Sequence, residues 1–334
     1  MMNAMPKSDP VLEIQHLKTY FHTEDGTVKA VDDASLCVPA GHIVCIVGES
    51  GCGKSITAMS VMGLIDTHVG KVEGGSILFQ GEDLLSLSKN ELRAIRGNEI
   101  AMIFQEPMSS LNPVLTIGQQ IMEPLIEHKK LSKKDAKQKA IELIERVQIS
   151  RPEQIFKSYP HELSGGMLQR IMIAIAISCE PKLLIADEPT TALDVTIQAQ
   201  ILEMLAELRE SLGMSILLIT HDLGVVAEMA DEVVVMYAGK VVEYGEVTAL
   251  FEQPRHPYTE GLLKSKPSIH ERTEELYSIP GQVPNPLELT ESCYFHDRCD
   301  KCMAICKAQS PQLYNINDDQ QAACWLYEEA VLRA

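Results

Sequence analysis

The sequence feature that most constrains this chain is an eight-residue stretch, Gly48-Glu49-Ser50-Gly51-Cys52-Gly53-Lys54-Ser55. The apolar run 43–47 before it reads as a buried strand, and the proline-free segment 56–64 after it predicts a helix. In this context, glycines let backbone N–H groups turn inward towards an anion, and the positive end of the helix points at the same spot. We therefore expect Lys54 to reach the phosphates of a nucleoside triphosphate and the Ser55 hydroxyl to ligate Mg²⁺.

Bulk composition excludes several classes of protein. The 334 residues suit two domains, and a hydrophobic content of 45% suffices for a sizeable core. A net charge of −18 argues against binding nucleic acid, which needs a basic footprint. The first ten residues lack a secretory signal, and the longest apolar run, 171–177, is too short for a membrane helix. These features predict a soluble, cytoplasmic protein.

The order of strand and helix signals predicts an α/β fold with a mainly parallel core sheet. Helical periodicity between about 88 and 160, clearest at 131–147, predicts a helical insert. After residue 251 the composition shifts to proline, polar residues and cysteine, which places a domain boundary near 250. Strands are expected at 11–17, 30–38, 43–47, 76–81, 100–104, 182–186, 215–220 and 232–237, and further helices at 197–212 and 224–229.

A second motif, Leu183-Leu184-Ile185-Ala186-Asp187-Glu188, is an apolar strand that ends in two acids. In P-loop enzymes a neighbouring strand delivers an acidic residue to Mg²⁺, a role that suits Asp187. Glu188, one residue further, is placed to orient or deprotonate an attacking water. A third segment, Leu163-Ser164-Gly165-Gly166-Met167, precedes a helical run, and Ser164 is suited to cap that helix. The chain therefore has two helix N-termini suited to phosphate.

The nine cysteines divide into two groups. Cys37, Cys45, Cys52 and Cys179 lie in mostly apolar surroundings and are expected to be small buried side chains. The other five, Cys293, Cys299, Cys302, Cys306 and Cys324, gather near the C-terminal end, where a reducing compartment favours metal over disulfides. By chemistry alone, four thiolates could hold zinc, and reduced structural cysteines are a further alternative.

Together, these motifs resemble the ATP-binding subunit of an ATP-binding-cassette (ABC) transporter, over roughly residues 11 to 330. The stretch 48–55 matches Walker A, 183–188 matches Walker B, and 163–167 matches the signature sequence. The resemblance implies that Gln105 contacts Mg²⁺ and the membrane subunits, and that Ala192-Leu193-Asp194 is the D-loop. It further implies that His221 contacts the γ-phosphate and that Phe21, with Tyr20 as the alternative, stacks on adenine. The cofactors implied are ATP and Mg²⁺.

The resemblance narrows to the dipeptide, oligopeptide and nickel importer branch. The segments 104–113 and 255–259 carry it, as does the C-x5-C-x6-C-x17-C pattern at Cys293, Cys299, Cys306 and Cys324. In relatives of the dipeptide permease ATPase, these four cysteines bind a four-iron, four-sulfur (4Fe-4S) cluster, and Cys302 departs from the pattern as an extra thiol. Their distance in sequence from Lys54 suggests that the cluster has a structural or docking role, separate from hydrolysis.

The resemblance also implies an assembly. An ABC nucleotide-binding domain at 11–250 would carry an antiparallel β subdomain and a helical insert at about 106–178, followed by a metal-cluster extension at 251–334. Two ATPases, in this branch usually two related chains, would share ATP between one Walker A and the partner's signature segment. The expected partners are a second homologous ATPase, two transmembrane permease subunits and, indirectly, an extracytoplasmic peptide-binding protein. The chain would lie on the cytoplasmic face of the membrane as a peripheral subunit.

The resemblance also admits functions other than ATP-driven peptide import. A soluble ABC ATPase of translation or DNA repair usually has tandem cassettes or a long coiled coil, and this sequence shows neither. A purely structural nucleotide-binding module is disfavoured by Glu188 and His221, which are both suited to catalysis. A nickel importer remains an alternative, because the cargo is chosen by the binding protein and the membrane subunits.

Overall fold

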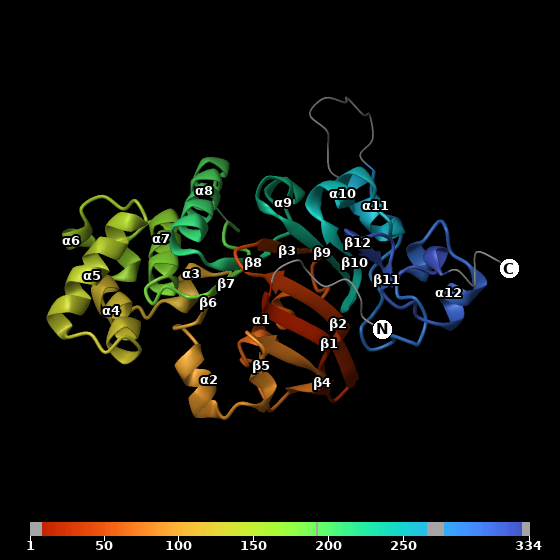
Figure 1. Ribbon diagram of the computed structural model, residues 1–334, viewed down its shortest axis with the longest axis horizontal. Coiled ribbons are helices and arrows are strands. Elements are labelled where there is room, and N and C mark those ends of the chain that lie inside the picture. The colour runs from red at the N-terminus through yellow and green to blue at the C-terminus, as the bar shows by residue number, and fades with distance from the viewer. Residues whose placement is uncertain (1–8, 192, 266–276, 329–334) are drawn as a thin grey trace. The chain divides into compact units, whose positions relative to one another are not determined.

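The computed structural model describes residues 9–191, 193–265 and 277–328 (Figure 1). The chain divides into two compact units. The first unit lies within residues Met1–Leu85 and Thr220–Ala334, and the second is Ser86–Ile219. The predicted boundary near residue 250 stays a prediction.

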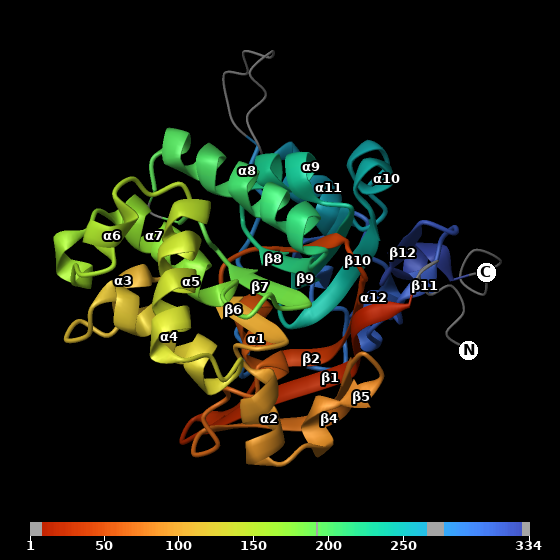
Figure 2. The same cartoon turned by 60° about the vertical axis from the view of Figure 1, so that its left-hand side comes forward.

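One sheet of the first unit is antiparallel, with the order β2-β1-β4-β5 (Figure 2). Its strands are β1 (Pro10–Thr23), β2 (Gly26–Pro39), β4 (Gly70–Phe79) and β5 (Glu82–Asp83). This sheet is the antiparallel β structure that the resemblance implied. The strands are longer than the sequence predicts. Residues 18–21 of β1 pair with both β2 and β4, and residues 22–23 pair with β2, although this stretch does not alternate clearly between apolar and polar.

The other strands of the first unit follow the order β11-β12-β10-β9-β3. Strand β3 (Ile43–Val47) is wholly buried and parallel to β9 (Glu232–Tyr237). Strand β10 (Lys240–Glu246) is antiparallel to β9 and to β12 (Gln320–Ala322), and β12 pairs with the short β11 (Tyr314–Asn315). The C-terminal segment, residues 277–328, thus extends this sheet. Helices of the unit are α1 (Lys54–Val61), α9 (Leu223–Met229), α10 (Val247–Glu252), α11 (Pro257–Lys264) and α12 (Ala304–Ala308).

The second unit combines three parallel strands with helices. Its strands, in the order β8-β7-β6, are β6 (Ile100–Ile103), β7 (Leu183–Asp187) and β8 (Ser215–Ile219). Helix α5 buries Ala136, Ala140, Leu143 and Ile144 along one face, which confirms the predicted amphipathic helix. The helices are α2 (Lys89–Ile95), α3 (Pro107–Ser110), α4 (Ile117–Glu127), α5 (Lys133–Arg146), α6 (Pro152–Ile155), α7 (Gly165–Ala176) and α8 (Val195–Leu212).

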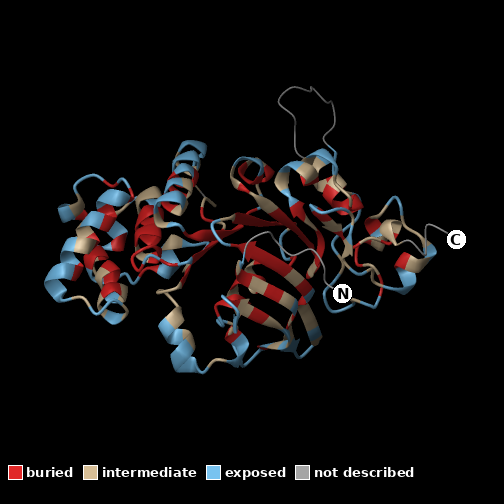
Figure 3. Cartoon of the chain, in the orientation of Figure 1, coloured by how far each residue is buried: buried red, intermediate tan, exposed pale blue. Residues whose placement is uncertain are grey.

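Buried residues are concentrated in the strands and on the inner faces of the helices within each unit (Figure 3). Cys37, Cys45, Cys52 and Cys179 are all buried free thiols, as the sequence predicts. No helix among the described residues combines the length and apolarity needed to cross a membrane.

Within the first unit, an aromatic cluster packs the C-terminal segment against β9 and α11. The ring of Phe295 lies 5.2 Å from that of Tyr237 in β9 and 5.5 Å from that of Tyr258 in α11, measured between centroids. His256 borders the same ring at 5.7 Å. Phe295 is 3% exposed and Tyr258 is fully buried. The segment therefore shares a core with β9 and α11, although its own sequence is poor in apolar residues.

Replacing Phe295 with alanine is expected to lower the free energy of unfolding by about 3 kcal/mol, because it leaves a cavity among three rings. The measurement is urea denaturation followed by circular dichroism. Tyr277→Ala, at a side chain that is 48% exposed, is the control and should change stability by less than about 1 kcal/mol. Equal effects of the two substitutions would contradict the shared core.

Candidate functional site

The loop between β3 and α1 depends on two glycines that approach neighbouring backbone closely. Gly48 has φ 152° and Gly53 has φ 102°. A Cβ atom on Gly48 would lie 2.2 Å from the carbonyl oxygen of Met236, and one on Gly53 would lie 2.4 Å from that of Ala30. Only glycine fits at these positions, so the loop is held against strands β9 and β2 in one conformation.

Lys54 is folded back over this loop. It is 6% exposed, and its Nζ donates hydrogen bonds to the carbonyl oxygens of Gly48 (2.8 Å) and Glu49 (3.1 Å). The ammonium is thus placed at the mouth of a helix N-terminus, where both charges favour a phosphate. Ser55, half-buried, follows in the first turn of α1. Burial raises the pKa of the Cys52 thiol despite the nearby Lys54 ammonium, so this cysteine is a packed side chain.

The second unit brings Gln105 and Glu188 together. Asp187 is the last residue of β7 and is buried, and Glu188 follows it with φ 47°. The Glu188 carboxylate accepts hydrogen bonds from Nε2 of Gln105 (2.9 Å) and from Oγ1 of Thr191 (2.8 Å). A left-handed glutamate is strained, and such strain is concentrated at functional sites. Sequence reasoning missed Thr191, whose only signal is its position three residues after Glu188.

The signature segment presents an open helix N-terminus. Ser164 is the N-cap of α7, and its hydroxyl accepts the N–H of Met167 at 3.4 Å. Ser164 and Gly165 are exposed, and a Cβ on Gly165 would meet nothing within 4 Å. A Cβ on Gly166 would lie 3.1 Å from Ile197 of α8, so this second glycine allows α7 and α8 to pack closely.

The remaining predicted loops lead into α8 and α9, which Asp194 and Asp222 cap. Asp194 caps α8 by accepting the N–H of Ile197 at 3.0 Å, while Ala192 of the predicted D-loop lies outside the described residues. His221 is exposed and directly precedes Asp222, which caps α9. The first unit contains His221 and the stretch 48–55, which we call the P-loop. The second unit contains the other predicted site residues described above, namely Gln105, Ser164–Gly166, Asp187, Glu188 and Asp194.

The two aromatic residues of β1 differ in their contacts. The hydroxyl of Tyr20 donates to Asp32 at 2.6 Å, and that carboxylate raises the Tyr20 pKa further above the level set by burial. Phe21 has no polar atom to satisfy, and its ring lies against Gly70, where a Cβ would come within 2.7 Å. Tyr20 thus has a polar partner in β2, whereas the ring of Phe21 packs against a glycine of β4.

The C-terminal thiols lie near one another. The N–H of Cys293 donates to the carbonyl oxygen of Cys306 at 2.8 Å. Burial raises the pKa of Cys293 to about 12, and the charges of Cys306, Cys324 and Cys299 add to that rise. However, no group of three or more His, Cys, Asp or Glu side chains among the described residues is arranged to hold a metal ion. As described, the side chains of these cysteines therefore do not form a ligand set.

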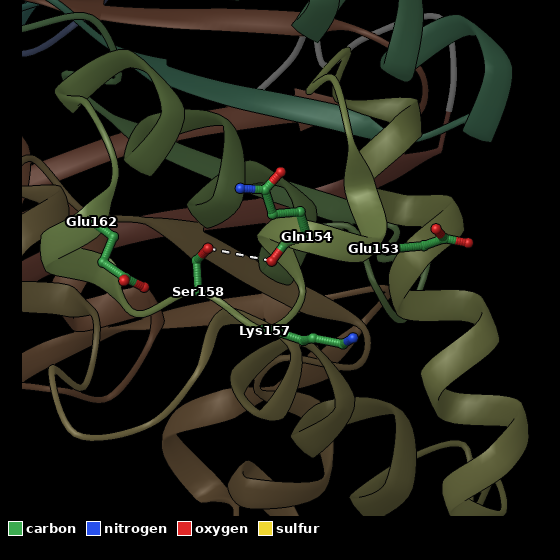
Figure 4. Close-up of a pocket in the computed structure, with 5 residues that line it drawn as sticks. All are labelled: Glu153, Gln154, Lys157, Ser158 and Glu162. Carbon is green, nitrogen blue, oxygen red and sulfur yellow. Dashed lines mark hydrogen bonds between the residues drawn. The ribbon is translucent and has the colours of Figure 1, made fainter.

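A surface hollow in the second unit is separate from these residues. Its volume is about 450 Å³, and Glu153, Gln154, Lys157, Ser158 and Glu162 line it around α6 (Figure 4). Its polar groups include the Ser158 hydroxyl, which donates to the carbonyl oxygen of Gln154 at 3.3 Å. No predicted site residue lines this hollow, and we assign it no function.

Replacing Gly53 with alanine is expected to weaken ATP binding by more than about tenfold, because the new Cβ must displace either the loop or β2. The measurement is titration of a fluorescent ATP analogue. Gly41→Ala is the matched control, since Gly41 lies outside the loop and also has a positive φ (76°), but its Cβ would meet nothing within 4 Å. Its effect should stay below about threefold. If the Gly53 variant bound the analogue normally, the close approach would not shape the site.

Comparisons with known proteins agree with this geometry. The family model for ABC transporters matches residues 31–191, and that for the C-terminal region of oligopeptide/dipeptide transporters matches residues 242–306. The oligopeptide transport ATP-binding protein AppD of Bacillus subtilis is 55% identical over 96% of this chain and 97% of that protein. The dipeptide transport ATP-binding protein DppD of Bacillus subtilis is 49% identical over 96% of each chain.

Solved structures show the same cassette. The ATP-binding cassette MJ0796, determined as a dimer in a post-hydrolysis state bound to ADP and Pi, is similar with a TM-score of 0.63 and 26% identity, over 71% of this chain and 98% of that one. The cbiO1 protein of Clostridium perfringens, part of the cbiONQ transporter complex, has a TM-score of 0.62 and 28% identity, over 74% of this chain and 92% of that one. The chain therefore belongs to the ATP-binding proteins of ABC transporters, in the oligopeptide/dipeptide branch.

Proposed function

We propose that this chain is the ATPase subunit that powers peptide import by an ABC transporter. The observation that carries the proposal is the near full-length similarity to peptide-transport ATP-binding proteins, and the close packing of the glycines in the loop 48–55 is consistent with it. The readout is ATP-dependent uptake of a labelled dipeptide by the assembled transporter in vesicles. Uptake of Ni²⁺ in place of peptide would support the nickel importer instead.

We further propose roles for the residues that bind nucleotide. Phe21 stacks on adenine, the loop from Gly48 to Ser55 surrounds the phosphates, and Lys54 neutralises their charge. Ser55, Gln105 and Asp187 would hold Mg²⁺, because hydroxyl, amide and carboxylate oxygens are the ligands it prefers. Mg²⁺ would offset the charge that develops on the phosphate oxygens during the reaction.

Glu188 is proposed as the residue that activates water. Its carboxylate lies one residue beyond the strand end, and Gln105 and Thr191 hold one of its oxygens. The carboxylate is suited to accept a proton as water attacks the γ-phosphorus in line with the leaving ADP. His221 would donate a hydrogen bond to a γ-phosphate oxygen, a contact that only the triphosphate can accept.

The catalytic unit is proposed to be a pair of ATPases. The exposed N-terminus of α7, with Ser164, Gly165 and Gly166, and the N-cap Asp194 would complete the partner's nucleotide site. The dimeric state of the similar cassette supports this arrangement. We propose that the partner is a second homologous ATPase, that two permease subunits anchor the pair at the cytoplasmic face of the membrane, and that an extracytoplasmic binding protein delivers the peptide.

We also propose that the C-terminal segment binds a 4Fe-4S cluster, with zinc as the alternative. The proposed ligands are Cys293, Cys299, Cys306 and Cys324. The spacing of the four cysteines supports it, as does the backbone hydrogen bond that brings Cys293 and Cys306 together at 2.8 Å. The described side chains would have to rearrange to form a ligand set, because none is present in the structure.

Replacing Glu188 with glutamine is expected to lower ATP turnover by about a hundredfold or more while ATP binding persists, because the base is lost and the shape is kept. The measurements are phosphate release by the assembled transporter and the affinity for ATP. Glu207→Gln, at an exposed glutamate of α8, is the control and should leave turnover unchanged. Turnover near wild type in the Glu188 variant would remove it from this role.

Replacing Cys324 with serine is expected to remove bound iron, because a hydroxyl is a poor iron ligand in such clusters. Metal analysis of protein purified without oxygen should find about four iron atoms per wild-type chain. Cys302→Ser is the matched control, since Cys302 lies outside the four-cysteine pattern, and it should retain iron. Colourless wild-type protein with one zinc per chain would establish the alternative, and protein without metal would refute both.

A further inference from the structure

The C-terminal segment reaches the P-loop through an ion pair. Nη1 and Nη2 of Arg298 donate to Oε2 and Oε1 of Glu49 at 2.7 and 3.0 Å, a two-pronged geometry that fixes both partners. Glu49 is the second residue of the stretch 48–55. The four cysteines of the C-terminal pattern were expected to have a role separate from hydrolysis. Arg298, which contacts the P-loop, directly precedes one of them, Cys299.

Arg298 is held in place by its own surroundings. Arg298 is 9% exposed, and its Nε donates to the carbonyl oxygen of Pro280 at 2.9 Å. Nη1 also donates to the Tyr237 hydroxyl at 3.3 Å, and the guanidinium lies 5.7 Å from the centre of that ring and 6.0 Å from that of Phe295. Because these contacts position the guanidinium, it loses little entropy in binding Glu49.

The backbone of Glu49 is bound as well. Its N–H donates to the Tyr258 hydroxyl at 2.9 Å, and its carbonyl oxygen accepts from Nζ of Lys54 at 3.1 Å. Glu49 is therefore the P-loop residue at which the segment after residue 250 and the phosphate-binding lysine both make contact.

Charge explains why this contact matters for nucleotide binding. A glutamate beside a triphosphate repels it, and like charges a few ångströms apart in a partly buried site interact strongly. Arg298 cancels the charge of Glu49, whose side chain is only 28% exposed. The Glu49 hydrogen bonds in turn raise the pKa of Arg298, so the guanidinium stays charged.

We propose that Arg298 is a positioning residue for the ATPase reaction, which neutralises and fixes Glu49 so that the C-terminal segment sets the affinity of the P-loop for ATP. The inference rests on the proposed nucleotide role of the P-loop. It assigns to the segment an influence on the nucleotide site that requires no bound metal.

The test is a double-mutant cycle in the full-length chain, with a fluorescent ATP analogue and Mg²⁺. Arg298→Met is expected to weaken binding about tenfold, because Glu49 is left unpaired. In a Glu49→Gln background, the same Arg298→Met change is expected to cost less than about threefold, since no charge needs cancelling. Arg298→Lys, which keeps the charge but not the fork, should recover part of the affinity, because the charge of Glu49 is again offset although its position is no longer fixed.

Kinetics of the assembled transporter distinguish positioning from catalysis. Arg298→Met should raise KM for ATP about tenfold and leave kcat within about twofold, because Arg298 acts on binding through Glu49. Lys301→Met is the control: it breaks an ion pair of the same segment with Glu260 (2.8 Å) and should alter neither constant.

Three results would overturn the inference. These are unchanged affinity in Arg298→Met, an equal loss in the Glu49→Gln background, and a failure of Arg298→Lys to recover affinity. The second result would mean that Arg298 only holds the segment in place. If the wild-type chain itself did not bind the analogue, the proposed nucleotide function would fail instead.

Discussion

The close approach of the P-loop backbone to its neighbouring strands is the constraint on which the rest of the nucleotide site depends. Gly48 and Gly53 lie so near the carbonyl oxygens of Met236 and Ala30 that no side chain fits between them. This contact fixes the direction of α1 and therefore the place where Lys54 and the helix N-terminus act on the same phosphate. The antiparallel sheet and β9 supply those carbonyls, so both sheets of the first unit shape the loop.

A second constraint operates at the end of β7. Glu188 adopts a left-handed backbone, and hydrogen bonds from Gln105 and Thr191 hold its carboxylate. Strain of this kind persists only where the surroundings over-determine the conformation. Here three polar contacts do so, including the Glu188 N–H donated to the carbonyl oxygen of Ile219 at 2.9 Å. The candidate base is thus positioned before any water reaches it.

The C-terminal segment belongs to the core of the first unit. It contributes β12 to a sheet, Phe295 to an aromatic cluster and Arg298 to the P-loop. The same short turn carries Arg298 and leads into Cys299, so the cysteine-rich segment and Glu49 are joined through a single residue. The segment therefore contacts the P-loop directly, and the influence on nucleotide binding that we propose for it requires no bound metal.

The sequence by itself determined the motifs, because phosphate binding requires particular residues at fixed local spacing. The glycine loop, the acidic strand end at Asp187 and the cap at Ser164 could all be read from neighbouring residues, and so could the amphipathic helix α5. Only the tertiary structure decided what depends on contacts distant in the chain. The pairing of β10 with β12, the Gln105 and Thr191 bonds to Glu188, and the ion pair between Glu49 and Arg298 are of this kind. Local propensity carries no information about partners that are brought together only when the sheets form and the core closes.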